Sequence, residues 1–199
     1  MFAALTATGL AAAAGLNAYI PFLLIALVAR YTDFITLPAS YQWIESGWAI
    51  GVGIVLLLVE VVLDKIPAVD SINDAVQTFV RPTMAGLISA ATTGAAALDN
   101  STWLTEHPWI NVTLGVVVAG LVHLGKAGAR PVVNAATVGI GAPVVSTVED
   151  GTSLGLSLVA VFLPALVILA LILLAAAMLG LWRRLRRRKR QRAASRARS

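Results

Sequence analysis

The sequence predicts an all-α integral membrane protein with about six transmembrane helices, some of them broken by glycine or proline. Of its 199 residues, 58% are hydrophobic and only 13% are charged, and the mean hydropathy is +0.84. A soluble domain of this length normally carries more charge. Several apolar runs approach or exceed the roughly 20 residues needed to cross about 30 Å of hydrocarbon. Apolar and polar residues do not alternate along these runs, so the pattern is not that of an outer-membrane barrel.

The charges divide the chain into a single transmembrane domain, residues 1–182, and a basic tail, residues 183–199. Ten of the 15 Lys and Arg residues lie in the tail, so the other five share the transmembrane domain with all 10 acids. A basic run beside a span usually sets its orientation and attracts anionic lipid. We therefore expect the lipid bilayer and anionic lipids, and not nucleic acid, as partners of this chain.

Six predicted spans are separated by polar segments or by glycine and proline. They cover residues 2–29, 47–63, 81–98, 112–125, 131–148 and 154–182. The first contains GLNAYIP, in which Asn17 needs a polar partner inside the membrane and Pro21 can kink the helix. The fifth begins at Pro131, a favoured first helical position, but contains further breaks, so it either crosses the membrane or is re-entrant. A tight acidic turn, residues 149–153, precedes the last span.

The stretch between the second and third spans, EVVLDKIPAVDSINDAVQTFVRP, is unusually polar for its surroundings. Glu60 and Asp64 are four residues apart, so they share a helical face at the end of the second span. A proline then breaks the helix, and a short amphipathic helix follows whose polar stripe includes Asp70, Asp74 and Arg81. Charges near a bilayer are costly, so they are expected to be functional or strongly paired.

A second polar stretch, HLGKAGARPVVN, follows the fourth span. His123, Lys126 and Arg130 are offset by three and seven residues, which places them on one helical face. We expect this stretch to meet the first one in a single polar site. Both stretches contain an Arg-Pro pair, residues 81–82 and 130–131, that opens an outward-running span, which suggests a duplicated helical hairpin.

The distribution of basic residues predicts an orientation. An even number of spans puts both termini on one side, and the positive-inside rule places the basic tail in the cytoplasm. Arg30 is then the only Lys or Arg residue in an outside loop. We therefore expect both termini in the cytoplasm.

Three motifs together resemble a known family: GLNAYIP, DKIPAVDSINDAVQTFVRP and HLGKAGARPVVNAATVGIGAP. Over about residues 5–175 the chain is similar to a bacterial membrane-protein family described as domain of unknown function 4126. The resemblance implies a small multi-pass protein of the bacterial plasma (inner) membrane. It implies no activity and therefore assigns no catalytic residue.

Three basic side chains, Arg81, Lys126 and Arg130, are the candidate ligands for a phosphate or carboxylate. Arg offers such groups a bidentate fork, and Lys offers a point charge. Asn17 and Asn134 would line the path of the ligand. These residues favour a transporter or translocase of a small anionic solute or an anionic lipid headgroup.

The acidic residues support two interpretations. They could carry protons, together with a histidine that titrates near neutrality, or they could pair with the bases of the other stretch. In the second case the chain is a structural or accessory membrane subunit, because an unpaired buried charge costs several kcal/mol. The candidates for proton transfer or ion pairing are Glu60, Asp64, Asp70, Asp74 and His123.

A metal-dependent lipid-modifying enzyme is a third and weaker alternative. The chain has no cysteine, its two histidines form no zinc motif, and it contains neither GxSxG nor a P-loop. We therefore expect no catalytic residue, no metal and no cofactor. Small-residue faces on the first and third spans permit a homo-oligomer.

Overall fold

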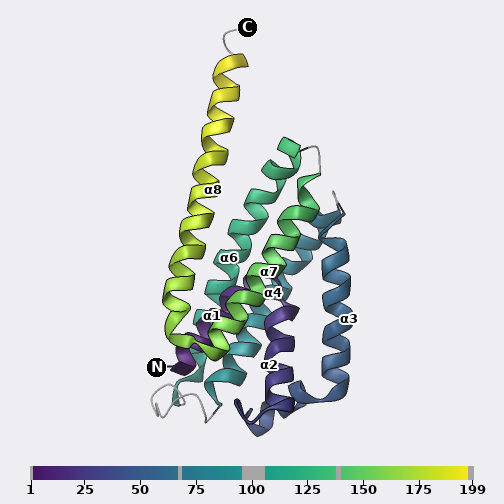
Figure 1. Ribbon diagram of the computed structural model, residues 1–199, viewed down its shortest axis with the longest axis vertical. Coiled ribbons are helices and arrows are strands. Elements are labelled where there is room, and N and C mark those ends of the chain that lie inside the picture. Colours follow the sequence, from purple (N-terminus) through teal and green to yellow (C-terminus); the bar gives the residue numbers. More distant parts are fainter. Residues whose placement is uncertain (1, 67–68, 96–105, 138–139, 197–199) are drawn as a thin grey trace.

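A computed structural model of the protein describes residues 2–66, 69–95, 106–137 and 140–196. This part of the chain is almost entirely helical and contains no strand (Figure 1). The α-helices are α1 (Phe2–Leu16), α2 (Tyr19–Tyr31), α3 (Gly47–Leu63), α4 (Val69–Thr93), α6 (Pro108–Thr137), α7 (Gly141–Phe162) and α8 (Val167–Arg196). Two short 3₁₀ helices, η1 (Ala39–Glu45) and η2 (Pro164–Leu166), precede α3 and α8.

Several helices have the length and composition of membrane spans. Three segments qualify among the described residues: Trp109–Ala135, Gly141–Phe162 and Pro164–Arg184. The pair η1 and α3, which meet at an angle of 58°, raises the number to four if they count as one span. The chain is therefore an all-helical membrane protein, and the six predicted spans are not confirmed.

The first predicted span is wrong as a single crossing, because it consists of two short helices separated by Asn17 and Ala18. Helices α1 and α2 have 15 and 13 residues, fewer than the roughly 20 that a crossing requires. Figure 1 shows α1 rising from the N-terminus into the bundle and α2 returning toward the end where α3 begins. Pro21 does not cause the break, since it lies in the first turn of α2, where a missing backbone donor costs little.

Helix α4 has the reverse of the polarity expected in a soluble protein. Its buried side chains include Asn73, Asp74, Gln77 and Arg81, whereas Ile72, Val76 and Phe79 are 69%, 56% and 79% exposed. Apolar side chains face outward in this way when the surroundings are lipid. The helix also runs without interruption through Arg81 and Pro82, so the prediction that a new helix opens there is wrong.

The predicted duplicated hairpin is also wrong. Helix α6 continues through Arg130 and Pro131 to Thr137, so the fourth predicted span and the start of the fifth form one helix. Helix α7 runs straight through residues 149–153, the predicted acidic turn. Its polar residues there have partners inside the bundle, since the Ser153 hydroxyl donates to the Ala13 carbonyl at 2.9 Å. Polar side chains that bond across a helix interface need not end a helix.

The last predicted span is divided at Pro164. Helix α7 ends at Phe162, and η2 connects it to α8, which continues through the basic residues to Arg196. Figure 1 shows the start of α1 at one end of the bundle and the end of α8 beyond the other end. This arrangement disagrees with the prediction that both termini lie on the same side.

Helix α1 lies at the centre and packs against α4, α6 and α7. Its alanines and glycines permit this close packing. A Cβ atom at Gly9 would lie 2.7 Å from the Cβ of Ala160, and one at Gly15 would lie 2.7 Å from the carbonyl oxygen of Ala119. The C-terminal end of α1 is thereby held among the charged residues of the neighbouring helices.

Candidate functional site

The two polar stretches meet inside the bundle and form a buried charge cluster. Six of its residues are no more than 6% exposed, and the side chain of the seventh, Glu149, is 12% exposed. They come from α3 and the residue after it, from α4, from α6 and from α7. The buried charge cluster consists of Glu60, Asp64, Asp74, Arg81, Lys126, Arg130 and Glu149.

Arg81 is the fully buried centre of one half of the cluster. Its Nη2 donates to Glu60 Oε1 at 2.7 Å, and its Nη1 lies 3.3 Å from the Gly15 carbonyl oxygen and 3.1 Å from His123 Nδ1. A guanidinium can only donate, so His123 Nδ1 accepts and the imidazole proton lies on Nε2. That nitrogen is 3.0 Å from the hydroxyl of Thr78 and donates to it. His123 is therefore held as the neutral tautomer beside Arg81.

Asp64 is the centre of the other half. Its Oδ2 accepts from Arg130 Nη2 at 2.9 Å and from Lys126 Nζ at 3.2 Å, and its Oδ1 accepts from Asn73 at 2.7 Å. Asp64 directly follows the last residue of α3. Burial alone would raise the pKa of its carboxyl group, but Lys126, Arg130 and Asn73 together lower that pKa to about 2. Asp64 is therefore an anion with all its acceptors engaged.

Glu149 connects α7 to the same basic residues. Its Oε2 lies 3.1 Å from Lys126 Nζ and forms a short ion pair with Arg130 Nη2. Arg130 also approaches Asp74, with its Nε 3.7 Å from Asp74 Oδ2. Lys126 and Arg130 thus lie between carboxylates from three separate segments of the chain.

The break between α1 and α2 supplies backbone groups to the cluster. The free carbonyls at the end of α1 are acceptors, and Lys126 Nζ bonds the Leu16 carbonyl at 2.9 Å. On the other side of the break, Asn17 Oδ1 accepts from the backbone amides of Tyr19 and Ile20 at 3.0 and 3.2 Å. The Asn17 amide donates to Asp150 Oδ1 at 2.9 Å. Asn17 therefore caps α2 and ties the break to α7, as a buried asparagine requires.

The cluster is not fully compensated, because its four carboxylates face only three basic side chains. Some of its polar atoms also have no hydrogen-bond partner in the described part of the chain, namely Glu60 Oε2, Asp74 Oδ1, Arg81 Nε and Arg130 Nη1. Buried polar groups are usually bonded, so each such atom calls for an explanation. The interior is thus polar enough to hold water, a proton or a ligand beside its ion pairs.

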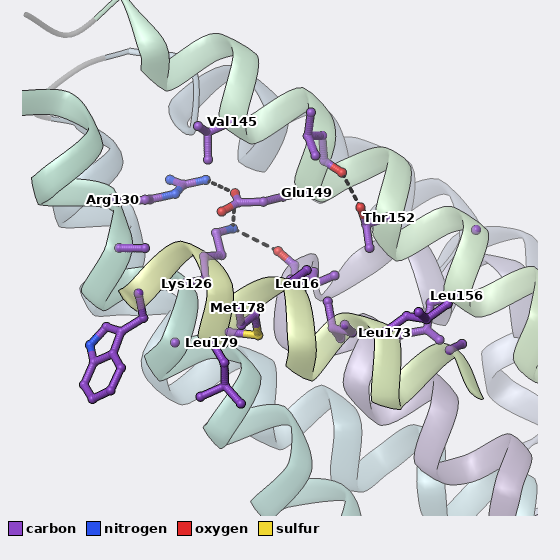
Figure 2. A pocket seen from close by; sticks show the side chains of 18 of the residues that line it. Leu16, Lys126, Arg130, Val145, Glu149, Thr152, Leu156, Leu173, Met178 and Leu179 are labelled. Atoms are coloured by element: carbon purple, nitrogen blue, oxygen red, sulfur yellow. Dashed lines mark hydrogen bonds and ion pairs between the residues drawn. The ribbon is translucent and has the colours of Figure 1, made fainter. Parts of the chain in front are cut away.

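A groove of about 930 Å³ opens beside the cluster between α6, α7 and α8. Its walls are almost entirely apolar, and its charged lining residues are Lys126, Arg130 and Glu149. Figure 2 shows these three side chains converging at the end of the groove near Met178 and Leu179. The groove is therefore amphipathic, with a charged end and a hydrophobic length.

Comparison with protein families settles the membership of the chain. The family model described as domain of unknown function DUF4126 matches residues 4–184 of the 199-residue chain. The chain belongs to the DUF4126 family. Comparisons with curated proteins and with solved structures give no match. The family resemblance expected from the three motifs is thus confirmed, and it carries no activity with it.

Most residues proposed for the site from sequence lie together. Beyond those in the buried charge cluster, Asn17 and His123 border it directly. Asn134 lies on α6, one turn beyond Arg130, and is partly buried. Asp70 lies at the start of α4, and its side chain is outside the described part of the chain.

Sequence reasoning missed Glu149 and Asp150 as site residues, because it placed both in an outside turn. A signal was present: helical spacing continues through residues 141–162 if the glycines are not taken as helix ends. No group of three or more His, Asp or Glu side chains arranged for a metal ion occurs among the residues that the structure describes.

Proposed function

We propose that this chain is a transporter or translocase of an anionic ligand, either a small anionic solute or an anionic lipid headgroup, that binds at Lys126 and Arg130. The observation that carries the proposal is Arg130 Nη1. This guanidinium nitrogen has no hydrogen-bond partner among the described residues, although Arg130 is only 4% exposed and lines the groove. Leaving a buried donor unbonded costs free energy. A phosphate or carboxylate oxygen would supply the missing acceptor.

The broken helix also supports transport. Many transporters bind substrate where a helix is discontinuous inside the membrane. Here the end of α1 and the start of α2 are bonded by the side chains of Lys126 and Asn17 rather than by backbone groups. Such side-chain partners can be exchanged for a ligand without loss of a helical hydrogen bond.

We place the protein in the bacterial plasma (inner) membrane with the basic end of α8 in the cytoplasm, following the positive-inside rule. The tail then lies against the anionic lipids of the inner leaflet. The start of α1, at the opposite end of the bundle in Figure 1, would lie outside. Reporter fusions at the two termini that are active on opposite sides of the membrane test this orientation.

A structural or accessory subunit is the second candidate, and the ion pairs favour it. Each basic residue of the cluster contacts a carboxylate: Arg81 contacts Glu60, and Lys126 and Arg130 contact Asp64. Under this alternative the charges only hold the helices together. Removing one partner of a buried pair is then expected to destabilise the fold by about 3–5 kcal/mol.

The substitution Arg130→Lys separates the two functions. Lysine keeps the charge that Asp64 and Glu149 require, but it lacks the planar fork and the second terminal nitrogen. The matched control is Arg30→Lys, because Arg30 is exposed at the end of α2, donates to the Glu45 carbonyl and lies outside the buried charge cluster. Each protein is reconstituted in liposomes, and two probes are followed: fluorescent phosphatidylglycerol moving between leaflets and radiolabelled inorganic phosphate entering the vesicles.

We expect Arg130→Lys to keep the thermal stability of the wild type and to lose about tenfold in transport, the effect of about 1.4 kcal/mol of binding. Arg30→Lys should behave as the wild type. If the wild type moves neither probe faster than protein-free liposomes, transport of these anions is refuted. If Arg130→Lys transports normally, the fork of Arg130 has no role in it.

A further inference from the structure

The length of the groove matches one leaflet of a bilayer. It follows α8 from Ala170 to Trp182, which is about 18 Å at a rise of about 1.5 Å per residue. One leaflet contributes half of about 30 Å of hydrocarbon, or about 15 Å. The volume of the groove, about 930 Å³, lies in the range of small-molecule sites, about 300–1,000 Å³.

The polarity of the groove changes along its length. Figure 2 shows Leu156 and Leu173 toward one end and Lys126, Arg130 and Glu149 at the other. The other lining residues are mostly aliphatic and include Val148, Val159 and Leu174. A fully water-soluble anion would leave this apolar length empty. An acyl chain would fill it and keep it dry.

The charged end lies at the level where α8 leaves the hydrocarbon. The groove ends at Trp182, and the basic run begins at the next residue, Arg183. Tryptophan is enriched at the headgroup level of a membrane, and lysine and arginine follow it on the cytoplasmic side. The charged end of the groove is therefore at headgroup depth, and the apolar length extends toward the middle of the bilayer.

We infer that the groove binds an anionic phospholipid of the leaflet on the side of the basic tail. The phosphate lies against Lys126 and Arg130, where it provides the acceptor that Arg130 Nη1 lacks. One acyl chain lies along α8, between α6 and α7. This inference rests on the proposed anion site and narrows its ligand to a lipid.

Glu149 is the residue that the phosphate displaces. Its carboxylate contacts Lys126 Nζ and Arg130 Nη2, so it neutralises the same two basic side chains that would attract the lipid phosphate. With Glu149 in place the three charged lining residues sum to +1, and without it the remaining two sum to +2. Glu149 therefore competes with the lipid, and Asp64 keeps the two bases paired from the opposite side.

The test fills the groove without touching the cluster. Gly155 lines the groove, and a Cβ there would meet no atom within 4 Å. Gly155→Phe places an aromatic ring in the path of the acyl chain. Gly151→Phe is the matched control, because Gly151 is on the same helix, is equally open and is not among the lining residues. Purified full-length proteins in detergent are titrated with phosphatidylglycerol or phosphatidylcholine, and bound lipid is counted by native mass spectrometry.

We expect the wild type and Gly151→Phe to prefer phosphatidylglycerol over phosphatidylcholine, and Gly155→Phe to bind phosphatidylglycerol at least about tenfold more weakly. Glu149→Gln should bind it more tightly than the wild type, because the competing charge is removed. Folding of each variant is checked by its thermal unfolding. Equal binding by Gly155→Phe and Gly151→Phe, or equal affinity for the two lipids, would overturn the inference.

Inorganic phosphate distinguishes failure of the lipid inference from failure of the anion site. If phosphate alone binds the wild type, and Gly155→Phe binds it equally well while neither protein retains phosphatidylglycerol, the anion site stands and the lipid is rejected. If neither phosphate nor phosphatidylglycerol binds, both proposals fall. If phosphatidylglycerol binds and phosphate does not compete with it, the acyl chain provides most of the affinity, as the groove predicts.

Discussion

The pair formed by Arg81 and Glu60 offers a quantitative test of what the buried charges do for stability. Arg81 is fully buried, and its Nη2 donates to Glu60 Oε1 at 2.7 Å. Arg81→Met keeps much of the length of the side chain but removes the charge. Glu60 is then left 1% exposed without its closest cation, and its Oε2 already has no partner among the described residues. Breaking a buried pair from one side costs about 3–5 kcal/mol.

The double variant Glu60→Met, Arg81→Met should behave differently. Removing both charges also removes the desolvation cost of each, and apolar replacements for a buried pair are often neutral or stabilising by about 1–4 kcal/mol. We therefore expect the double variant to be more stable than Arg81→Met alone. Glu60→Met alone should cost less than Arg81→Met, because Arg81 keeps a second carboxylate, Asp64, at 3.7 Å.

The assay is the free energy of unfolding in mixed detergent micelles, followed by the fluorescence of the chain's 5 tryptophans. The four proteins form a double-mutant cycle, which isolates the pair energy from other effects of each substitution. Arg30→Met, at an exposed arginine, should change the free energy by no more than about 0.5 kcal/mol. If the losses of the two single variants simply add in the double variant, the pair is not coupled and the reasoning is refuted.

Three further predictions use the same unfolding measurement. Gly15→Ala should lower the free energy of unfolding by about 1–3 kcal/mol through overpacking, because the new Cβ meets the Ala119 carbonyl. The control Gly120→Ala should be neutral or stabilising, because a Cβ there meets no atom within 4 Å. Equal effects of the two substitutions would contradict the packing of α1 on α6. Asn17→Ala should cost about 0.5–2 kcal/mol through the lost cap of α2, and a variant as stable as the wild type would show that the cap contributes nothing. The pKa of Asp64 is lowered from 3.8 to about 2, so its contribution to stability is present above its ordinary pKa and is lost as the pH falls toward about 2. Asp64→Asn should therefore flatten the loss of stability between about pH 4 and pH 2, and an unchanged pH profile would show that Asp64 is not the group that titrates.

The meeting of the two polar stretches could be anticipated from the sequence, because charges in an apolar chain must find partners. Asp64 and Arg130 are 66 positions apart and bond directly, as expected of acids and bases that share one membrane. The helical spacing of the polar residues likewise predicts the polar stripe of α4. These features depend on composition and local periodicity, which a single sequence contains.

The ends of the helices could not be predicted in the same way. Arg-Pro at residues 81–82 and 130–131 is typical of a helix start, yet both pairs lie inside continuous helices. Neighbouring helices compensate for the missing backbone donor of proline, and that packing is not visible in the local sequence. Glu149 was assigned to a turn for the same reason, since only the positions of Lys126 and Arg130 in space show that it faces inward.

The break between α1 and α2 has a consequence for the order in which contacts form while the protein is being synthesised. The end of α1 is bonded by Arg81, Lys126 and Ser153, all from segments synthesised much later. Neither α1 nor α2 is long enough to cross the bilayer by itself. The polar contacts at the end of α1 can therefore form only after α4, α6 and α7 have been synthesised, so the helix at the centre of the bundle depends on segments that follow it in the chain.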